Sequence, residues 1–435
     1  MNMARGGSKV MRVGCLNVRG ANAEIKKGEV GLIFRERNLD VLALTETKLK
    51  GEGNIDFGGF NGSFSGVNER VRAREGVAII MKDEWWRCVR EFKRVNPRLM
   101  WVRLKLSKES WVFVCAYAPV SGGNEREREA FWEELNECLG SLNKTDRVCV
   151  LGDLNARVGN TRVNRVVGPF GVEGINENGE MLIDLCVEKK FMIGNTWFEK
   201  QSIHKYTWVS GVNGERALLD YVCVEQRIKD RLLDVNVLRG AAGGISDHFL
   251  VEARVRIKGG WNKRESRSEV VEIIKVERLD DMEYKEMYKR KMIEKWGSLN
   301  KSGGNGVEEQ WRVLKETVDE VARDVCGVKR VGEKEKRKGS EWWSGELENL
   351  VKKKREAFEH YLGVKSVEAW EMYKERNREV KRAVRYAKRR ADENWSMKIV
   401  DGYKEKSKMF WKEVNKARKK RDNMCGMIKD ILTSC

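Results

Sequence analysis

The fold and the site are both indicated most directly by one stretch, Val148-Cys149-Val150-Leu151-Gly152-Asp153-Leu154-Asn155-Ala156. A continuous apolar run that ends at a glycine is typical of a strand buried on both faces of a sheet. Asp153 and Asn155 stand two residues apart, so their side chains point the same way in an extended chain. A carboxylate and a carboxamide at the end of a buried strand suit a phosphate and a hard metal ion. The alternative interpretation is a turn cap.

Charge indicates the kind of partner. The chain has 435 residues, enough for two or three domains, and a formal net charge of +19 with 35% charged residues. Such an excess favours nucleic acid or an acidic membrane surface over the alternative of a lysine-rich face in water. The first ten residues contain no apolar stretch of signal-peptide length, and no later run has the length of a bilayer span. We therefore expect no membrane partner.

The ten cysteines form no CxxC pair. Cys115, Cys149 and Cys223 lie inside apolar, strand-like runs, where a thiol behaves as a small hydrophobic group. This pattern predicts a reducing compartment and no zinc cluster.

Strand patterns are concentrated before about residue 258. Strands are expected at 13–18, 41–44, 77–81, 101–106, 111–118, 148–151, 206–208, 218–224 and 249–257. Helices are expected at 23–37, 125–142 and 180–189, with a loop rich in Gly and Asn at 160–179. We predict a domain over residues 10–258 after a disordered N-terminus of residues 1–9.

The pattern changes to helices near Gly259-Gly260, which opens a predicted linker of residues 259–272. A basic helical region is predicted at 273–428, with helices near 274–298 and 306–326. An antiparallel helical pair follows, with Gly363 as the stop between its helices. From residue 261 onward the chain has 45 Lys and Arg against 33 Asp and Glu. Basic clusters at 352–355, 381–390 and 418–421 favour phosphate contact or nuclear import over a solvated face, so we expect a nuclear protein.

Polar residues recur where the predicted strands end. They are Asn17, Glu46, Tyr117, Asp153, Asn155, Asp220, Asp247 and His248. In layered sheet folds catalytic groups gather at strand ends, where loops converge. Glu46 can bind Mg²⁺, and Asn17 can hold the same ion or a phosphate oxygen without adding charge. The set predicts metal-assisted hydrolysis of a phosphodiester.

The remaining roles follow from side-chain chemistry. Asp153 can orient or deprotonate a water, and Asn155 can donate to charge that develops on a phosphate. Asp247 beside His248 offers a pair that locks the imidazole in one tautomer. Each residue also has a purely structural interpretation: a surface carboxylate for Glu46, a turn for Asn17, strand-end packing for Tyr117, and a cap for Ser246-Asp247-His248.

The order of these pieces resembles the exonuclease–endonuclease–phosphatase superfamily. The matching segments are Leu16-Asn17-Val18-Arg19-Gly20, Leu44-Thr45-Glu46-Thr47-Lys48, Gly76-Val77-Ala78-Ile79, Tyr117-Ala118-Pro119, Gly152-Asp153-Leu154-Asn155-Ala156, Leu219-Asp220-Tyr221 and Ser246-Asp247-His248. Within the superfamily the chain is most similar to endonuclease domains of LINE-type (non-LTR) retrotransposons. That similarity rests on Asn176-Glu177-Asn178-Gly179, Asn195-Thr196 and Tyr206-Thr207-Trp208.

The resemblance implies a four-layered α/β sandwich, DNase I-like, followed by an all-α basic helical region similar to the linker before a reverse transcriptase. It implies a Mg²⁺-dependent nuclease, with Mn²⁺ as an alternative metal, that nicks DNA and leaves a 3′-hydroxyl. In the family pattern Glu46 and Asn17 serve the metal, and Asp153 and Asn155 serve the water and the transition state. Tyr117 touches the phosphate, Asp220 orients the histidine, and Asp247 with His248 completes the site. His248 and Asp153 remain rival general bases.

One departure from the family pattern is visible, because Thr45 replaces the usual Gln before the metal-binding Glu46. Two other functions fit the fold. One is a catalytically silent nuclear or chromatin protein that binds DNA, and complete motifs count against it. The other is a phosphatase or sphingomyelinase, and the basic helical region counts against that.

Overall fold

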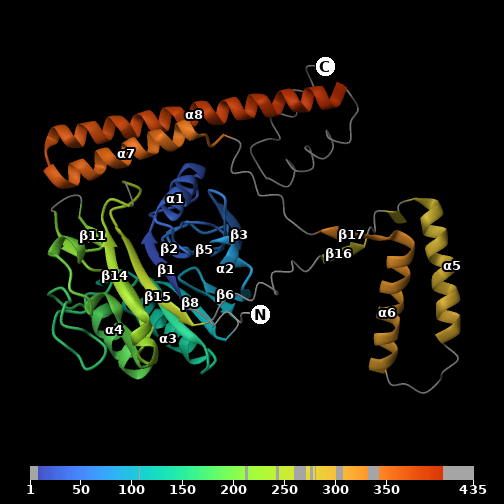
Figure 1. The fold of residues 1–435 in the computed structure, drawn as a ribbon, viewed down its shortest axis with the longest axis horizontal. Helices are drawn as coiled ribbons and strands as arrows, with labels where there is room; N and C mark the ends of the chain where they lie inside the picture. Colours follow the sequence, from blue (N-terminus) through green and yellow to red (C-terminus); the bar gives the residue numbers. More distant parts are fainter. Residues whose placement is uncertain are drawn as a thin grey trace, which may run out of the picture. The chain divides into compact units, whose positions relative to one another are not determined.

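The computed structural model describes residues 8–106, 108–210, 214–241, 244–258, 271–274, 278–279, 281–299, 307–331 and 342–404 (Figure 1). The chain divides into two compact units. The larger unit is built from residues 1–261 and 338–435, and the smaller unit from residues 262–337. In the described part of the chain, no helix is long and apolar enough to cross a membrane.

A seven-stranded sheet runs in the order β14-β15-β1-β2-β5-β4-β3. The pair β1–β2 is parallel, and it sets Asn17 beside Thr45, so the carboxyl ends of both strands lie at one edge of the sheet. The strands are β1 (Ser8–Asn17), β2 (Val41–Thr45), β3 (Glu52–Phe57), β4 (Phe60–Ser65), β5 (Val77–Met81), β14 (Leu232–Leu238) and β15 (Leu250–Lys258).

A six-stranded sheet runs in the order β10-β13-β9-β8-β7-β6. Its parallel pair, β8–β9, sets Tyr117 beside Asp153, and the antiparallel pair β9–β13 sets Asp153 beside Asp220. Three neighbouring strands thus present polar side chains at one edge. The strands are β6 (Val89–Asn96), β7 (Leu99–Lys105), β8 (Ser110–Tyr117), β9 (Arg147–Asp153), β10 (Phe191–Ile193) and β13 (Asp220–Glu225).

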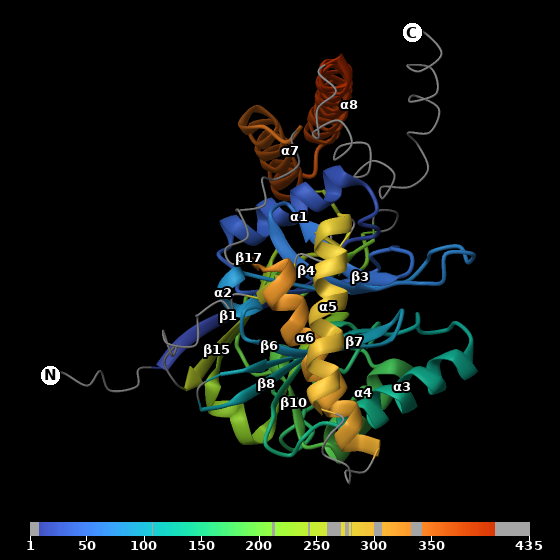
Figure 2. The ribbon, with the colours of Figure 1, turned by 90° about the vertical axis from the view of Figure 1, so that its right-hand side faces the viewer.

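Three buried apolar clusters lie between the four layers of the sandwich. Apolar side chains of both sheets, such as Val13 and Phe113, meet in one buried cluster between them. The helix α1 (Glu24–Glu36) covers the outer face of the first sheet. The helices α3 (Glu125–Gly140) and α4 (Glu177–Glu188) cover the second. Figure 2 shows this order from α1 to α3 and α4. The predicted four-layered sandwich is confirmed.

Short elements complete the larger unit. They are the helix α2 (Asp83–Trp86), the hairpin β11 (Trp208–Val209) with β12 (Arg216–Ala217), and the 3-10 turns η1 (Gly194–Thr196), η2 (Ser202–His204) and η3 (Gln226–Arg231). The strand thiols of Cys115, Cys149 and Cys223 are buried and free, in line with the prediction that they pack as small hydrophobic groups.

Two long helices, α7 (Gly345–Val364) and α8 (Val367–Lys404), belong to the larger unit and form the predicted antiparallel pair (Figure 1). The predicted stop is wrong by two residues. Gly363 lies inside α7, and the left-handed residue that ends the helix is Lys365, with φ 55°. Sequence reasoning assigned the stop to the glycine because glycine adopts this conformation most readily.

The smaller unit contains α5 (Met282–Leu299), α6 (Val307–Cys326) and a ribbon of β16 (Val271–Ile274) with β17 (Val328–Val331). The helix expected from 274 begins at 282, and the ribbon was not predicted. β-branched residues with alternating charges favour such short strands. The cluster at 418–421 and the predicted linker residues 259–270 lie outside the described residues.

Two other predicted boundaries need correction. The strand β1 begins at Ser8, within the predicted disordered N-terminus, because its first residues pair with the end of β15. The helix α4 begins at Glu177 instead of Glu180, because the Asn176 side chain accepts a hydrogen bond from the Gly179 N–H at 2.9 Å. Asn is a favoured cap at this position.

Candidate active site

The predicted site residues converge where strands of the two sheets end. A cavity of about 380 Å³ lies there, and its walls include seven of the eight predicted residues: Asn17, Glu46, Tyr117, Asp153, Asn155, Asp247 and His248. The eighth, Asp220, is fully buried and contacts His248. The structure therefore brings the whole predicted set together.

Gly152 permits the close strand spacing that the site needs. Its φ is +152°, and a Cβ added there would lie 1.9 Å from the Ala116 carbonyl oxygen. A larger residue would push β9 away from β8. The glycine thus keeps Asp153 directly beside Tyr117.

Asp153 joins the two sheets. Asn17, on β1, donates a hydrogen bond from Nδ2 to Asp153 Oδ2 at 2.8 Å. The other carboxylate oxygen, Oδ1, accepts from the Asn155 backbone N–H at 3.0 Å. Both oxygens are therefore oriented by the protein, and the carboxylate is only 2% exposed.

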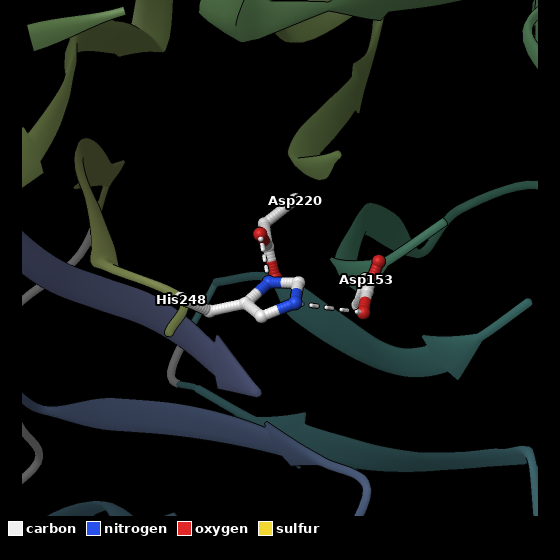
Figure 3. Close-up of side chains that lie close together, drawn as sticks. All are labelled: Asp153, Asp220 and His248. Carbon is white, nitrogen blue, oxygen red and sulfur yellow. Dashed lines mark hydrogen bonds and ion pairs between the residues drawn. The ribbon is translucent and has the colours of Figure 1, made fainter. Parts of the chain in front are cut away.

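His248 is held by Asp220 (Figure 3). The imidazole Nδ1 lies 2.8 Å from Asp220 Oδ2, which assigns the Nδ1–H as the donor. Nε2 is then directed toward Asp153, 3.9 Å from Oδ2. Thr207 fixes Asp220 in turn, because its hydroxyl oxygen accepts from the Asp220 N–H at 3.1 Å.

Burial and neighbouring charges shift both titrating groups. Burial, followed by the Asp220 carboxylate, raises the pKa of Asp153 to about 7, although His248 and hydrogen bonds from Asn17 and Asn155 oppose the shift. Burial lowers the pKa of His248, but Asp220 and Asp153 outweigh it and raise the pKa to about 9. Near neutral pH the imidazole is therefore positively charged.

Asp247 does not lock the imidazole, contrary to one interpretation of the sequence. Its Oδ2 accepts from Arg19 Nη1 at 2.8 Å and from Trp208 Nε1 at 3.1 Å. Adjacent residues on an extended chain point to opposite sides, so Asp247 and His248 face different partners. The orienting carboxylate is Asp220, as the family resemblance implied.

Glu46 and Asn17 offer the hard oxygen donors that suit Mg²⁺. Glu46 adopts a left-handed conformation, with φ 52°, and its carboxylate contacts the Lys48 ammonium at 2.8 Å. Arg19, Lys48 and Asn155 also have positive φ. Such conformations cost energy in residues other than glycine, and their concentration around one cavity is typical of functional sites.

A second donor set is formed by Asp153, Asp220 and His248, whose ligand atoms lie within 4.8 Å of one another. In this set the His248 Nδ1 and an Asp220 oxygen are already joined by a hydrogen bond, which a metal would have to replace. Glu46 and Asn17 are also engaged, because the Glu46 carboxylate contacts Lys48 and the Asn17 amide oxygen accepts from the Arg19 N–H at 3.0 Å. They offer oxygen ligands only, which a hard divalent cation prefers.

Tyr117 and Asn155 complete the walls. Burial, followed by the Glu46 carboxylate, raises the pKa of Tyr117 well above its ordinary value, so the phenol keeps its proton. One N–H of the Asn155 amide donates to the Ala118 carbonyl at 2.9 Å, which fixes the amide plane. Both side chains are thus placed as hydrogen-bond donors toward the cavity.

Sequence reasoning missed seven residues of the cavity wall: Arg19, Val120, Ser121, Arg157, Asn176, Trp208 and Leu219. Each lies in, or within two residues of, a motif segment that carries the family resemblance. Closeness to a motif was therefore the feature of the sequence that could have identified these residues. Asn176 also has a supporting role, because its Nδ2 donates to the Asn155 carbonyl at 3.0 Å.

The four-layered fold and the carboxylates of the cavity define the class of the protein. Residues 14–248 match the Endonuclease/Exonuclease/phosphatase family, and the chain belongs to that family. Family members of this kind are hydrolases, and the prediction from the ordered motifs is confirmed.

Particular relatives cover only part of the chain. Craniofacial development protein 2 of Bos taurus is 30% identical over 249 residues, which are 57% of this chain and 41% of that protein. The protein of the same name from Tragulus javanicus is also 30% identical, over 57% of this chain and 42% of its own length. The chain thus spans less than half the length of these relatives.

Solved structures are similar at low identity. The AP endonuclease LMAP from Leishmania major is 17% identical, with a TM-score of 0.43, over 57% of this chain and 88% of its own. The endonuclease domain of TRAS1, a telomere-specific non-LTR retrotransposon, is 13% identical, with a TM-score of 0.41, over 57% of this chain and 99% of its own.

Proposed function

We propose that the protein is a Mg²⁺-dependent DNA endonuclease that hydrolyses a phosphodiester bond and leaves a 3′-hydroxyl. The observation that carries the proposal is the hydrogen bond from Asn17 to Asp153 across the two sheets. It places a candidate metal ligand beside a buried carboxylate, which in turn lies 3.9 Å from a charged imidazole.

The proposed roles follow from these positions. Asp153 orients the attacking water and accepts its proton, since both of its oxygens are fixed and the carboxylate lines the cavity. His248 donates a hydrogen bond from Nε2 to a phosphate oxygen, while Asp220 holds the ring. Tyr117 and Asn155 donate to other phosphate oxygens. The bond from phosphorus to the 3′ oxygen breaks, the 3′ oxygen takes a proton from solvent water, and the phosphate stays on the 5′ end at the nick.

Glu46 and Asn17 are the proposed metal ligands. A bound divalent cation would supply positive charge to the phosphate and to the leaving oxygen. The Lys48 ammonium contacts Glu46 at 2.8 Å, so it would give up this contact on metal binding.

DNA is the proposed substrate because Arg19 and Arg157 line the cavity and the chain as a whole carries +19. We also propose a nuclear location and descent from a LINE-type retrotransposon. The first rests on the basic clusters, and the second on the motif segments at 176–179 and 206–208.

The chemistry of the product ends tests this proposal. Duplex DNA treated with the protein and Mg²⁺ is offered to a DNA polymerase with labelled nucleotides. Extension from the new ends without prior phosphatase treatment is expected. Ends that require a 3′-phosphatase before extension would contradict the proposed bond cleavage, and intact DNA would contradict the endonuclease itself.

A further inference from the structure

The helices α7 and α8 lie beyond residues 14–248, the part of the chain that matches the family, yet they pack against the same unit that carries the site. Figures 1 and 2 both place them over α1. Leu32 of α1 shares a buried cluster with Leu347 and Val351 of α7 and Val380 and Val384 of α8. The helical pair is therefore integrated into the core of this unit.

A buried ion pair fixes this contact. Lys354 Nζ of α7 lies 2.6 Å from Glu29 Oε1 of α1, and the two side chains are 4% and 5% exposed. Beside it, Trp343 packs directly on Gly28, where an added Cβ would lie 2.5 Å from the indole ring. Because a buried charge without its partner is costly, the ion pair favours this position of α7.

The helical pair also contacts the loop that leads into Asp247 and His248. The Tyr373 hydroxyl of α8 donates to the Gly244 carbonyl at 3.3 Å. Glu359 of α7 packs on Gly240, where an added Cβ would lie 2.1 Å from the carboxylate. These contacts hold the loop against α7 and α8.

Lys26 connects this loop to the other wall of the site. It lies three residues before Glu29, on the same face of α1. Its Nζ donates to the Val18 carbonyl at 2.7 Å and to the Ile245 carbonyl at 2.9 Å. Val18 follows Asn17 directly, and Ile245 lies two residues before Asp247.

We infer that Lys26 is a positioning residue for the active site, and that α7 and α8 support it by packing on α1 and, through Tyr373, by holding the loop before Asp247. The ammonium crosslinks the loop after Asn17 to the loop before Asp247. The helical pair covers α1 and presses on the second loop. Lys26, which lies within the family match, and Tyr373, which lies outside it, therefore act together on the separation between Asn17 and His248.

The test uses the full chain with Lys26→Met, which keeps the aliphatic stem and removes the donors, and Tyr373→Phe, which removes one hydroxyl. Lys27→Met is the matched control, because Lys27 lies on the same helix and its Nζ pairs with Glu24 at 2.6 Å instead of with the two site loops. Lys26→Met is expected to lower kcat for DNA nicking about 10- to 100-fold with little change in KM, since small misplacements of catalytic groups have effects of this size. Tyr373→Phe is expected to lower kcat by a smaller factor, and Lys27→Met not at all.

This inference rests on the proposed nuclease, so a second measurement is independent of activity. Hydrogen exchange of the backbone amides at 18–20 and 245–248 is expected to be faster in Lys26→Met and Tyr373→Phe than in Lys27→Met. Faster exchange in a chain that never nicks DNA would contradict the proposed function alone. Unchanged exchange and unchanged kcat in both variants would overturn the positioning role. A general loss of protection across both sheets in Lys26→Met would overturn the positioning role in favour of a purely structural one. If Lys26→Met does not fold, the exchange rates and kcat of Tyr373→Phe decide the test.

Discussion

His248 depends on one hydrogen bond for its orientation. Asp220 holds Nδ1 at 2.8 Å, and this contact directs Nε2 toward Asp153. The two aspartates also raise the pKa of His248 to about 9, against the effect of burial. The charge and the direction of the imidazole therefore have the same source.

Asp220→Asn tests this dependence. The introduced amide is uncharged, so it accepts the Nδ1–H less strongly, and its N–H groups favour the tautomer in which Nδ1 has no proton. We therefore expect kcat for nicking to fall on the order of 100-fold or more. Steady-state nicking kinetics give the comparison. Asp184→Asn, at an exposed position on α4, is the control and should leave kcat unchanged. Equal kcat values for the two variants would contradict the assigned role.

Gly152 is the second position where one residue decides the site. A methyl group there meets a backbone carbonyl oxygen at 1.9 Å. We expect Gly152→Ala to lower the free energy of unfolding by about 3 kcal/mol or more, because β8 and β9 must separate. Urea denaturation measures it. Gly345→Ala, with no atom within 4 Å of the added Cβ, should change stability by less than about 0.5 kcal/mol. Similar values for both would contradict this account of the strand spacing.

The site residues were predictable because each lies at one end of an apolar run in the sequence, and the ends of neighbouring strands meet at one edge of a sheet. Their contacts were not predictable. The Asn17–Asp153 hydrogen bond spans two sheets, and the Lys26 hydrogen bonds join loops more than 200 positions apart. Such contacts depend on how the layers stack, which periodicity does not encode. The ribbon β16–β17 was missed because its short strands lie among charged, helix-like sequence.

At the level of secondary structure, the helical pair α7–α8 is held to α1 by apolar contacts around one buried ion pair. A buried pair contributes little net stability when intact, because desolvation offsets the attraction. Removing one partner leaves a buried charge and is costly. The ion pair thus defines where α7 docks more than how strongly it docks.

Lys354→Met measures the cost of leaving Glu29 buried without its partner. We expect the free energy of unfolding to fall by about 3–5 kcal/mol, because Glu29 is left buried without its partner. Lys352→Met should change it by less than about 1 kcal/mol, since Lys352 is half-exposed and lies 3.9 Å from Glu36. Adding Glu29→Met to Lys354→Met should recover much of the loss. A double variant less stable than Lys354→Met would contradict the assignment of the cost to an unpaired charge. Urea denaturation gives all three values.

For the whole molecule, charge is unevenly distributed. Residues 381–390 of α8 contain six basic and no acidic side chains. Lys381, Arg385 and Arg390 are exposed there. This surface, in addition to the cavity, is where we expect the phosphate backbone of DNA to make contacts that do not depend on base sequence.

Replacing Lys381, Arg385 and Arg390 with Gln tests the contribution of α8. We expect affinity for duplex DNA to fall similarly for all sequences, and the slope of log K against log salt to decrease by about 1 for each lost phosphate contact. Fluorescence anisotropy over a salt series gives the slope. The same replacement of Arg90, Lys105 and Lys108 in the sheet domain removes equal charge and should leave the slope nearly unchanged. Equal slopes for the two variants would assign the effect to net charge alone.

The proposed endonuclease is tested most directly by nicking of supercoiled plasmid. The full chain is incubated with Mg²⁺, with EDTA, and in parallel as Asp153→Ala, and the fraction of open circles is measured over time. We predict open circles that need Mg²⁺ and that are lost in Asp153→Ala while DNA binding persists. Equal nicking by the wild type and Asp153→Ala, or no nicking by folded wild-type protein that binds DNA, would contradict the proposal.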